Sequence, residues 1–234
     1  MTDAFNIHAF RNVVRAAEAD LYRELFRQHK NRIKVKKESV AVRNLARIFE
    51  AALALGNEKG FSAMSMRDLG ARSGLSMGAL YTYFTGKDAL LDMIQQSSLN
   101  IIARIINDQV KETYPAAKKL NRAIFAHLYL SEIMHPWFFF AFMEAKNLNK
   151  NARQKAIEIE LCIENIFADI ITAGQQAGVF RKVKSDLAAA MIKALLQDWY
   201  LKKWKYESRH VGVETYAGLI TGMVESYLLI STET

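Results

Sequence analysis

A short segment of the chain gathers hydroxyl groups, small side chains and a lysine. Gly78 and Ala79 carry almost no side chain, so a helix backbone at this point can approach the floor of a major groove, and Lys87 follows a few residues later. Hydroxyl groups, cations and helix N-termini hold the phosphates of a duplex and set the register of a protein on it. The hydroxyl groups here belong to Ser76, Tyr81, Thr82 and Tyr83.

Patterns typical of enzymes and metal sites are missing from the sequence. It has no Gly-rich phosphate loop, no HExxH, no GxSxG and no close pair of carboxylates in a defined motif. The five histidines do not fall at i,i+4 spacing, and the single cysteine, Cys162, excludes a disulfide framework and a cysteine-based zinc site. We therefore expect no catalytic residues, no metal and no cofactor, and the chain is not predicted to be an enzyme.

The segment from residue 65 to residue 84 reads as two short helices joined by a tight turn. Ser65 can cap a helix that runs to about Ser73 and closes at Gly74, and Ser76 can cap a second helix from Met77 to about Phe84. This arrangement is typical of a helix-turn-helix. An amphipathic helix predicted over residues 42–59 would complete a three-helix core with the apolar side chains of Leu69, Leu75, Leu80 and Phe84.

The charge is concentrated just before this motif. The chain has 32 basic and 24 acidic residues, a net charge of +8, and residues 30–47 hold seven basic side chains against Glu38 alone. Such a run is often only a solvated connector, but its position favours nucleic-acid binding. We expect extra contacts to the DNA backbone, or to a neighbouring groove, from Lys34, Lys36, Lys37 and Arg43.

Helical spacing of apolar residues extends over almost the whole chain, and no period-2 strand pattern is present. The predicted fold class is therefore all-α. Further helices are expected over residues 8–32, 87–110, 150–177, 185–204 and 213–230. Pro115 and Pro136 are expected to mark the starts of other helices. The longest apolar run has seven residues and no signal peptide is evident, which favours a soluble, cytoplasmic protein.

The sequence from about Arg43 to Ile94 resembles the TetR family of bacterial transcription regulators. The densest part is MSMRDLGARSGLSMGALYTYFTGKDALLDMI, in which the pattern LYxYF and the pair Lys87-Asp88 stand at family spacing. The resemblance implies a recognition helix whose DNA contacts fall on Ser76, Met77, Gly78, Ala79, Tyr81, Thr82 and Tyr83. It also implies a phosphate contact at Lys87 and contacts to backbone or bases at Ser65 and Arg67.

Some of these positions have a structural alternative. Tyr81 can be a core ring with only its hydroxyl exposed, while Ser65 and Ser76 are helix caps in either case. The recognition helix lacks the Arg, Asn or Gln residues that make bidentate base contacts, so Met77, Ala79 and the Thr82 methyl are expected to meet thymine methyl groups instead.

Three regions follow from the resemblance. Residues 1–40 form an N-terminal extension that family members usually lack, read either as an extra amphipathic helix or as a tail. Residues 41–95 form the helix-turn-helix domain, and residues 96–234 a larger helical domain for ligand binding and dimerisation. The apolar residues expected in the homodimer interface are Leu187, Met191, Leu195, Tyr216, Ile220, Met223 and Tyr227. Those expected in the ligand pocket are Phe125, Tyr129, Met134, Trp137, Phe138, Phe142 and Trp199.

The implied function is a ligand-responsive DNA-binding regulator. The resemblance favours a homodimeric repressor that a small hydrophobic ligand, acyl-type among the options, releases from a palindromic double-stranded DNA operator. A basic cluster formed by Lys202, Lys203, Lys205 and Arg209 can hold an anionic head group or simply be a solvated helix end. The competing interpretation is a lipid- or membrane-binding helical module, although acidic residues on the polar face of the first helix disfavour membrane contact.

Overall fold

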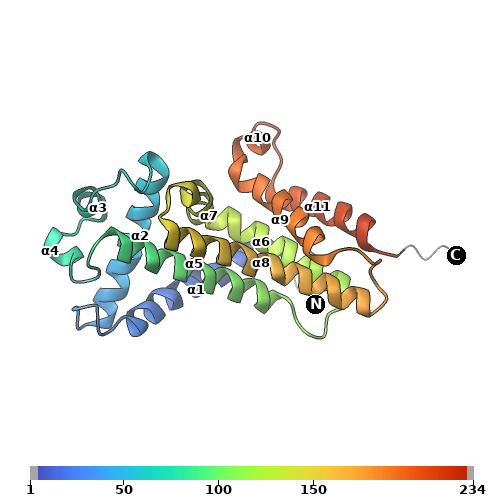
Figure 1. Ribbon diagram of the computed structural model, residues 1–234, viewed down its shortest axis with the longest axis horizontal. Helices are drawn as coiled ribbons and strands as arrows, with labels where there is room; N and C mark the ends of the chain where they lie inside the picture. Colours follow the sequence, from blue (N-terminus) through green and yellow to red (C-terminus); the bar gives the residue numbers. More distant parts are fainter. Residues whose placement is uncertain (1–4, 231–234) are drawn as a thin grey trace. The chain divides into compact units, whose positions relative to one another are not determined.

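The computed structural model describes residues 5–230, and these fold into α-helices joined by short turns (Figure 1). The only β-pairing among them is an isolated antiparallel bridge between Phe180 and Leu229, which confirms the all-α prediction for this part of the chain. The helices are α1 (Ile7–Gln28), α2 (Glu38–Lys59), α3 (Met66–Ser73), α4 (Met77–Leu80), α5 (Lys87–Gln109), α6 (Ala116–Ile133), α7 (His135–Glu144), the 3-10 helix η1 (Ala145–Asn147), α8 (Lys150–Gln176), α9 (Ser185–Leu201), α10 (Lys203–Glu207) and α11 (Val213–Leu228).

The described residues divide into two compact units. The helix-turn-helix unit contains residues 15–101 and 136–157, and the C-terminal unit contains residues 5–14, 102–135 and 158–230. Three helices, α1, α5 and α8, each contribute residues to both units because each is continuous across a boundary. The two compact units therefore do not coincide with the predicted division of the chain at residue 95. That division stays a prediction about which residues bind DNA and which bind the ligand.

The core of the helix-turn-helix unit forms where the apolar stripes of its helices meet. Leu45, Ile48 and Phe49 of α2 are fully buried, as are Leu69 of α3 and Leu80 of α4. Aromatic rings extend this core, because Phe49 packs on Tyr22 of α1 and on Trp137 of α7, with ring centroids 5.6 Å apart in both pairs. The rings of Phe61 and Phe140 meet edge to face at 5.7 Å.

The C-terminal unit is built around α6, which packs against both α9 and α11. The first residues of α1 belong to this unit. Phe10 is 2% exposed and packs on Tyr129 at a centroid separation of 5.5 Å. The carboxylate of Glu214 accepts hydrogen bonds from the backbone N–H of Ile7 at 3.3 Å and from the Tyr129 hydroxyl at 3.4 Å. Burial, followed by the charge of Glu214, raises the pKa of Tyr129 to about 12.

Several helix boundaries differ from the prediction: α1 ends at Gln28 instead of residue 32, and α2 begins at Glu38 instead of residue 42. The helix expected from residue 185 to residue 204 ends at Leu201, and a separate short helix, α10, follows. The N-cap position of α9 is Lys184, and its side chain makes no capping hydrogen bond. Within residues 5–230, no helix is long and apolar enough to cross a membrane.

Candidate DNA-binding surface

The turn between α3 and α4 depends on two glycines. Gly74 has φ +66°, the left-handed conformation that favours glycine, and its N–H donates to the Gly70 carbonyl. The N–H of Leu75 donates to the same carbonyl at 3.1 Å. A Cβ atom at Gly74 would lie 2.5 Å from the Arg47 guanidinium, and one at Gly70 would lie 2.9 Å from the Leu75 carbonyl. A side chain at either position would therefore force its neighbours to shift.

Ser65 starts α3 through a reciprocal capping box. Its hydroxyl oxygen accepts from the Asp68 N–H at 3.1 Å, and the Asp68 carboxylate accepts from the Ser65 N–H at 2.8 Å. Lys59 pairs with the same carboxylate at 2.7 Å. The hydrogen bond from Lys59, followed by those from Ser65, lowers the pKa of Asp68. The charge of this carboxylate is therefore neutralised within the protein rather than presented to a ligand.

The recognition helix is shorter than predicted. Ser76 caps α4 by accepting from the Ala79 N–H at 3.2 Å, but the helix ends at Leu80 and the chain continues as a tight turn through Tyr83. The Thr82 hydroxyl donates to the Ala79 carbonyl at 2.6 Å and competes with continued helical bonding. Aromatic and β-branched residues after Leu80 also have lower helix propensity.

Most of the residues implied by the family resemblance lie at the surface of this motif. Tyr81 is 49% exposed and Met77 is 36% exposed, so the Tyr81 ring is not part of the core. Nothing lies within 4 Å of a Cβ built at Gly78, which leaves the backbone of α4 open to a ligand. Ala79 and Thr82 are half-buried. The exposed residues of the set are Ser65, Arg67, Ser76, Met77, Gly78 and Tyr81.

Tyr83 is a correction to the predicted contacts. Its ring is 2% exposed, and its hydroxyl accepts a 2.9 Å hydrogen bond from the side-chain amide of Asn44 on α2. Leu80, Tyr83 and Phe84 follow i, i+3, i+4 spacing, an apolar pattern that could have placed Tyr83 in the core. Two side chains of α2 also support the motif: Asn44 bonds Tyr83, and the Arg47 guanidinium lies against Gly74.

Lys87 begins α5 and already has partners in the free protein. Its ammonium donates to the Ser62 carbonyl at 2.7 Å and lies 5.4 Å from the centre of the Phe61 ring. To contact a phosphate, the Lys87 ammonium must therefore either use another of its N–H groups or give up its hydrogen bond to Ser62. The other predicted backbone contacts, Lys34, Lys36, Lys37 and Arg43, are all exposed.

Two family models match the chain and together cover more than half of it. The model described as bacterial regulatory proteins, tetR family, matches residues 48–94, and the model described as tetracyclin repressor-like, C-terminal domain, matches residues 113–223. The chain belongs to the tetR family. It is a DNA-binding transcriptional regulator, and the capped α3–α4 motif lies inside the first matched segment.

Individual relatives agree with this assignment. The fatty acid metabolism regulator protein of Bacillus subtilis is 26% identical over 165 residues, which cover 68% of this chain and 85% of that protein. The transcriptional repressor KstR2 of Mycobacterium tuberculosis is 23% identical over 76% of this chain and 92% of that protein. A crystal structure of the regulator FadR from Bacillus subtilis in complex with stearoyl-CoA has the same fold, with a TM-score of 0.64, 22% identity, and coverage of 76% of this chain and 96% of that chain.

The residues predicted to line the ligand pocket of this tetR-family regulator do not gather in one unit. Phe125, Tyr129, Met134 and Trp199 belong to the C-terminal unit, whereas Trp137, Phe138 and Phe142 belong to the helix-turn-helix unit. The Trp199 indole donates to Glu132 at 3.1 Å, and its ring stacks on that of Tyr206 at 5.1 Å. Phe142 is 47% exposed. The ligand pocket lined by these seven side chains stays a prediction.

The basic cluster after α9 is largely neutralised. Lys202 and Lys205 both pair with Asp198, and Lys203 pairs with Glu132 at 2.9 Å. Burial raises the pKa of Asp198, but hydrogen bonds from Lys202, Lys205 and Tyr206 outweigh it and lower the pKa overall. An anionic head group would have to displace these carboxylates, so the structure does not favour this cluster as its binding site.

The predicted dimer residues separate into exposed and buried sets. Tyr216 is 6% exposed and Ile220 is 2% exposed, so both are core residues of the protomer, which corrects the prediction for them. Leu195 is half-buried, and its carbonyl accepts from the Tyr216 hydroxyl at 2.7 Å. Leu219 is 62% exposed and was missed, although it lies one turn before Met223. The exposed members of the predicted set are Leu187, Met191, Met223 and Tyr227.

Proposed function

We propose that the chain is a homodimeric repressor that reads a palindromic operator with α3 and α4 and leaves it when an apolar ligand binds the C-terminal unit. The observation that carries DNA reading is the exposed α4 face, where Met77, Gly78 and Tyr81 stand clear of a core formed by Leu80 and Tyr83. A capped helix whose exposed face carries small side chains can bring its backbone close to the floor of the major groove.

Base recognition on α4 would be mostly apolar. The helix carries no Arg, Asn or Gln, and the Thr82 hydroxyl already donates to the Ala79 carbonyl. The groups left for base edges are therefore the Met77 side chain and the Ala79 and Thr82 methyl groups, which suit thymine methyls. Arg67, exposed on the first turn of α3, supplies a cation close to the motif.

A second copy of the chain is the proposed partner of the apolar face on α9 and α11. Leu187 and Met191 of α9 are 57% and 66% exposed, and Met223 of α11 is 53% exposed. Single apolar side chains are normal on protein surfaces, but several large ones exposed on two helices that contact each other suit an interface. Two recognition helices must also reach half-sites about 34–36 Å apart, which a two-fold dimer provides.

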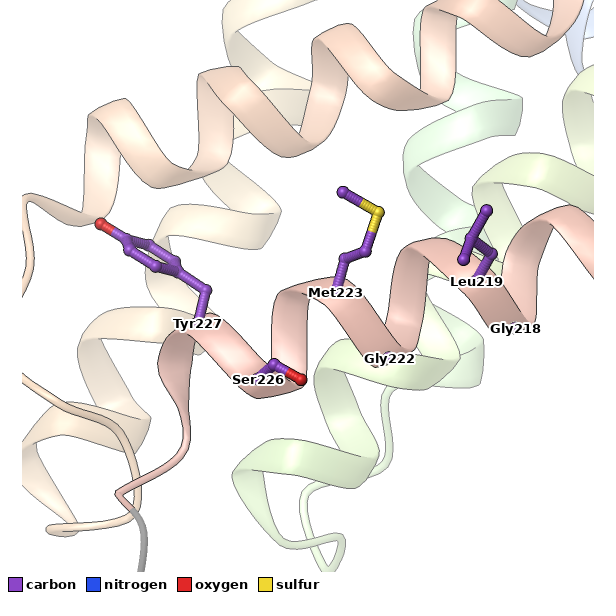
Figure 2. Close-up of a pocket in the computed structure, with 6 residues that line it drawn as sticks. All are labelled: Gly218, Leu219, Gly222, Met223, Ser226 and Tyr227. Carbon is purple, nitrogen blue, oxygen red and sulfur yellow. The ribbon is translucent and has the colours of Figure 1, made fainter.

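The α11 part of this face is shaped for close helix packing (Figure 2). A surface groove of about 640 Å³ runs along Gly218, Leu219, Gly222, Met223, Ser226 and Tyr227. One side of α11 carries the large side chains of Leu219, Met223 and Tyr227. Beside them, the small residues Gly218, Gly222 and Ser226 leave room for another helix to approach the backbone. Replacing Met191 and Met223 with glutamate should give a folded monomer by light scattering, and a persistent dimer would contradict this interface.

The proposed ligand is an apolar molecule of the acyl or acyl-CoA class. Support comes from the relatives, since one is named a fatty acid metabolism regulator and a structure of the same fold is in complex with stearoyl-CoA. KstR2, another relative, is named a ketosteroid transcriptional regulator in its structure, so a steroid is the second candidate. In either case the ligand lowers operator affinity only if it binds the DNA-incompatible geometry more tightly.

α5 is the element through which such a response would reach the DNA. Its first residue, Lys87, bonds the carbonyl of Ser62, and Asp92 further along pairs with Lys155 of α8 at 2.8 Å. The Gln95 side chain donates to the Ala152 carbonyl at 2.9 Å. The start of α8 is thus held to the DNA-proximal half of α5, and both helices continue into the C-terminal unit.

The decisive experiment is selection of genomic DNA fragments by the purified protein, followed by sequencing. A regulator enriches a palindrome, and replacing Met77 and Tyr81 with alanine should abolish the enrichment without lowering the melting temperature. Addition of stearoyl-CoA should then lower affinity for the selected site. If no site is enriched while the protein co-sediments with anionic vesicles, the lipid-binding interpretation replaces this one. We further propose a cytoplasmic location, where the operator lies, and no enzymatic activity, since the matched relatives are named as regulators.

A further inference from the structure

The linker between α1 and α2 presents a row of cations on one side. Residues 33–37 form neither helix nor strand, and from residue 32 to residue 36 exposed and covered side chains alternate. Ile33 is 4% exposed and Val35 is half-buried, and these two residues form the inward row. The outward row is fully exposed and consists of Arg32, Lys34 and Lys36.

The linker is attached to the recognition turn by its backbone. The N–H of Lys34 donates a 2.9 Å hydrogen bond to the carbonyl of Thr82, in the turn that follows α4. Both residues belong to the helix-turn-helix unit, and in Figure 1 the linker lies at the same end of that unit as α4. The outward cations are therefore held beside the surface proposed to read the operator, rather than on a free connector.

The described residues do not compensate the charge of this row, and the adjoining carboxylate of Glu38 is paired elsewhere. Within residues 5–230, no ion pair or side-chain hydrogen bond involves the side chains of the outward row. The acidic residue next to the row in the sequence, Glu38, already pairs with Arg27 at 3.5 Å. Unpaired cations beside a carboxylate that is already neutralised give the linker a net positive potential, which attracts a polyanion.

We propose that the linker is a second DNA-binding element, a backbone-contacting arm whose outward row binds phosphates flanking the base pairs read by α4. This inference rests on the proposed function. Phosphate contacts add affinity and fix register without reading sequence. The arm thus supplies electrostatic binding that α4, which lacks cationic side chains, does not provide.

DNA suits this arm better than an anionic membrane does. A basic segment that lies on a membrane needs apolar side chains that are free to enter the bilayer. Here Ile33 is buried in the protein and Val35 is half-buried, so neither is fully available to a bilayer. The Lys34–Thr82 hydrogen bond also places the row at the helix-turn-helix.

The test replaces the outward row in the full-length protein with alanine, as Arg32→Ala, Lys34→Ala and Lys36→Ala together. A matched control removes three exposed cations of the C-terminal unit with the same change in net charge: Lys182→Ala, Lys184→Ala and Arg209→Ala. Affinity for the selected operator is measured over a range of salt concentrations. The arm variant should bind more weakly, and the slope of log K against log salt should fall by roughly 2–3, since each lost phosphate contact removes about 0.9.

Unchanged affinity and slope in the arm variant, or an equal loss in the control, would overturn the proposal. Loss of vesicle binding without loss of DNA binding would overturn it in favour of a membrane partner. A wild-type protein that selects no operator would instead refute the proposed function, so the two failures are distinguishable. Melting temperatures should match, because all the replaced side chains are exposed.

A second pair of variants tests the attachment itself. Lys34→Ala removes one charge, whereas Lys34→Pro removes the charge and the N–H that donates to Thr82. If the hydrogen bond positions the arm, the proline variant should bind the operator more weakly than the alanine variant at every salt concentration. Equal affinities would overturn the positioning role of this bond.

Discussion

The side-chain amide of Asn44 donates a 2.9 Å hydrogen bond to the hydroxyl of Tyr83, and this contact joins α2 to the turn that follows the recognition helix. The Tyr83 ring is 2% exposed. Burial raises the pKa of Tyr83, although the Asn44 hydrogen bond and the charge of Arg43 act in the opposite direction. Tyr83 therefore supports the DNA-binding surface from inside the protein, while Tyr81 belongs to the surface itself.

Tyr83→Phe should lower stability and leave DNA binding intact. The variant keeps the buried ring but leaves the Asn44 amide without its acceptor, which should cost about 1 kcal/mol in the free energy of unfolding. Urea unfolding measures this cost, and operator affinity at low temperature should stay at the wild-type value. Tyr81→Phe is the matched control, expected to have wild-type stability. A large loss of operator affinity in Tyr83→Phe at full folding would show that its hydroxyl contacts DNA directly.

Alanine at the two exposed glycines of the motif should act in opposite directions on stability. Gly78→Ala should raise the free energy of unfolding by roughly 0.5 kcal/mol, because its new methyl meets no atom in the protein and the unfolded chain loses freedom. The same methyl should weaken operator binding if the α4 backbone approaches the groove. Gly74→Ala should lower stability by about 1–2 kcal/mol, because φ there is positive. Thermal melts and operator titrations of both variants check this pair, and tighter DNA binding by Gly78→Ala would contradict the docking proposed for α4.

Ser65→Ala should destabilise α3 by removing its capping box. The lost hydrogen bond to the Asp68 N–H should lower the free energy of unfolding by about 1 kcal/mol. Urea unfolding followed by circular dichroism measures the difference. Ser62→Ala, at an exposed position in the same loop, serves as the control and should match the wild type. Equal stability of the two variants would mean that the capping box contributes nothing.

The stability of the protein should fall as the pH drops below the ordinary pKa of histidine. His127 is fully buried, and burial, followed by the charge of Lys193, holds its pKa well below 6.5. The unfolded chain therefore takes up a proton in this range that the folded protein does not. Stability from this group is complete above pH 6.5 and is lost as the pH falls toward the folded-state pKa, at up to about 1.4 kcal/mol per pH unit.

Urea unfolding of the wild type and of His127→Gln, at several pH values below neutrality, tests this dependence. In His127→Gln the free energy of unfolding should depend less steeply on pH, because the proton uptake of His127 is removed. His8→Gln, at an exposed position, should keep it. Identical slopes in the wild type and His127→Gln would show that another group is responsible.

The sequence alone determined the features that depend on neighbouring residues. Ser65, Gly74 and Ser76 mark helix ends because a hydroxyl cap and a left-handed glycine act within a few residues, and all three do so in the structure. The helical spacing of apolar residues similarly predicted an all-α chain. The spacing of LYxYF and Lys87-Asp88 indicated the family, to which the chain belongs.

Only the tertiary structure decided which residues are buried and which are exposed. Tyr81 and Tyr83 are the same residue type two positions apart, yet one is exposed and the other buried, because α2 and Asn44 pack against only one of them. Tyr216 and Met223 both lie on α11, but neighbouring helices bury the first and leave the second exposed. The bond from Lys34 to Thr82 joins residues far apart in the chain, and such contacts arise only when the helices between them fold.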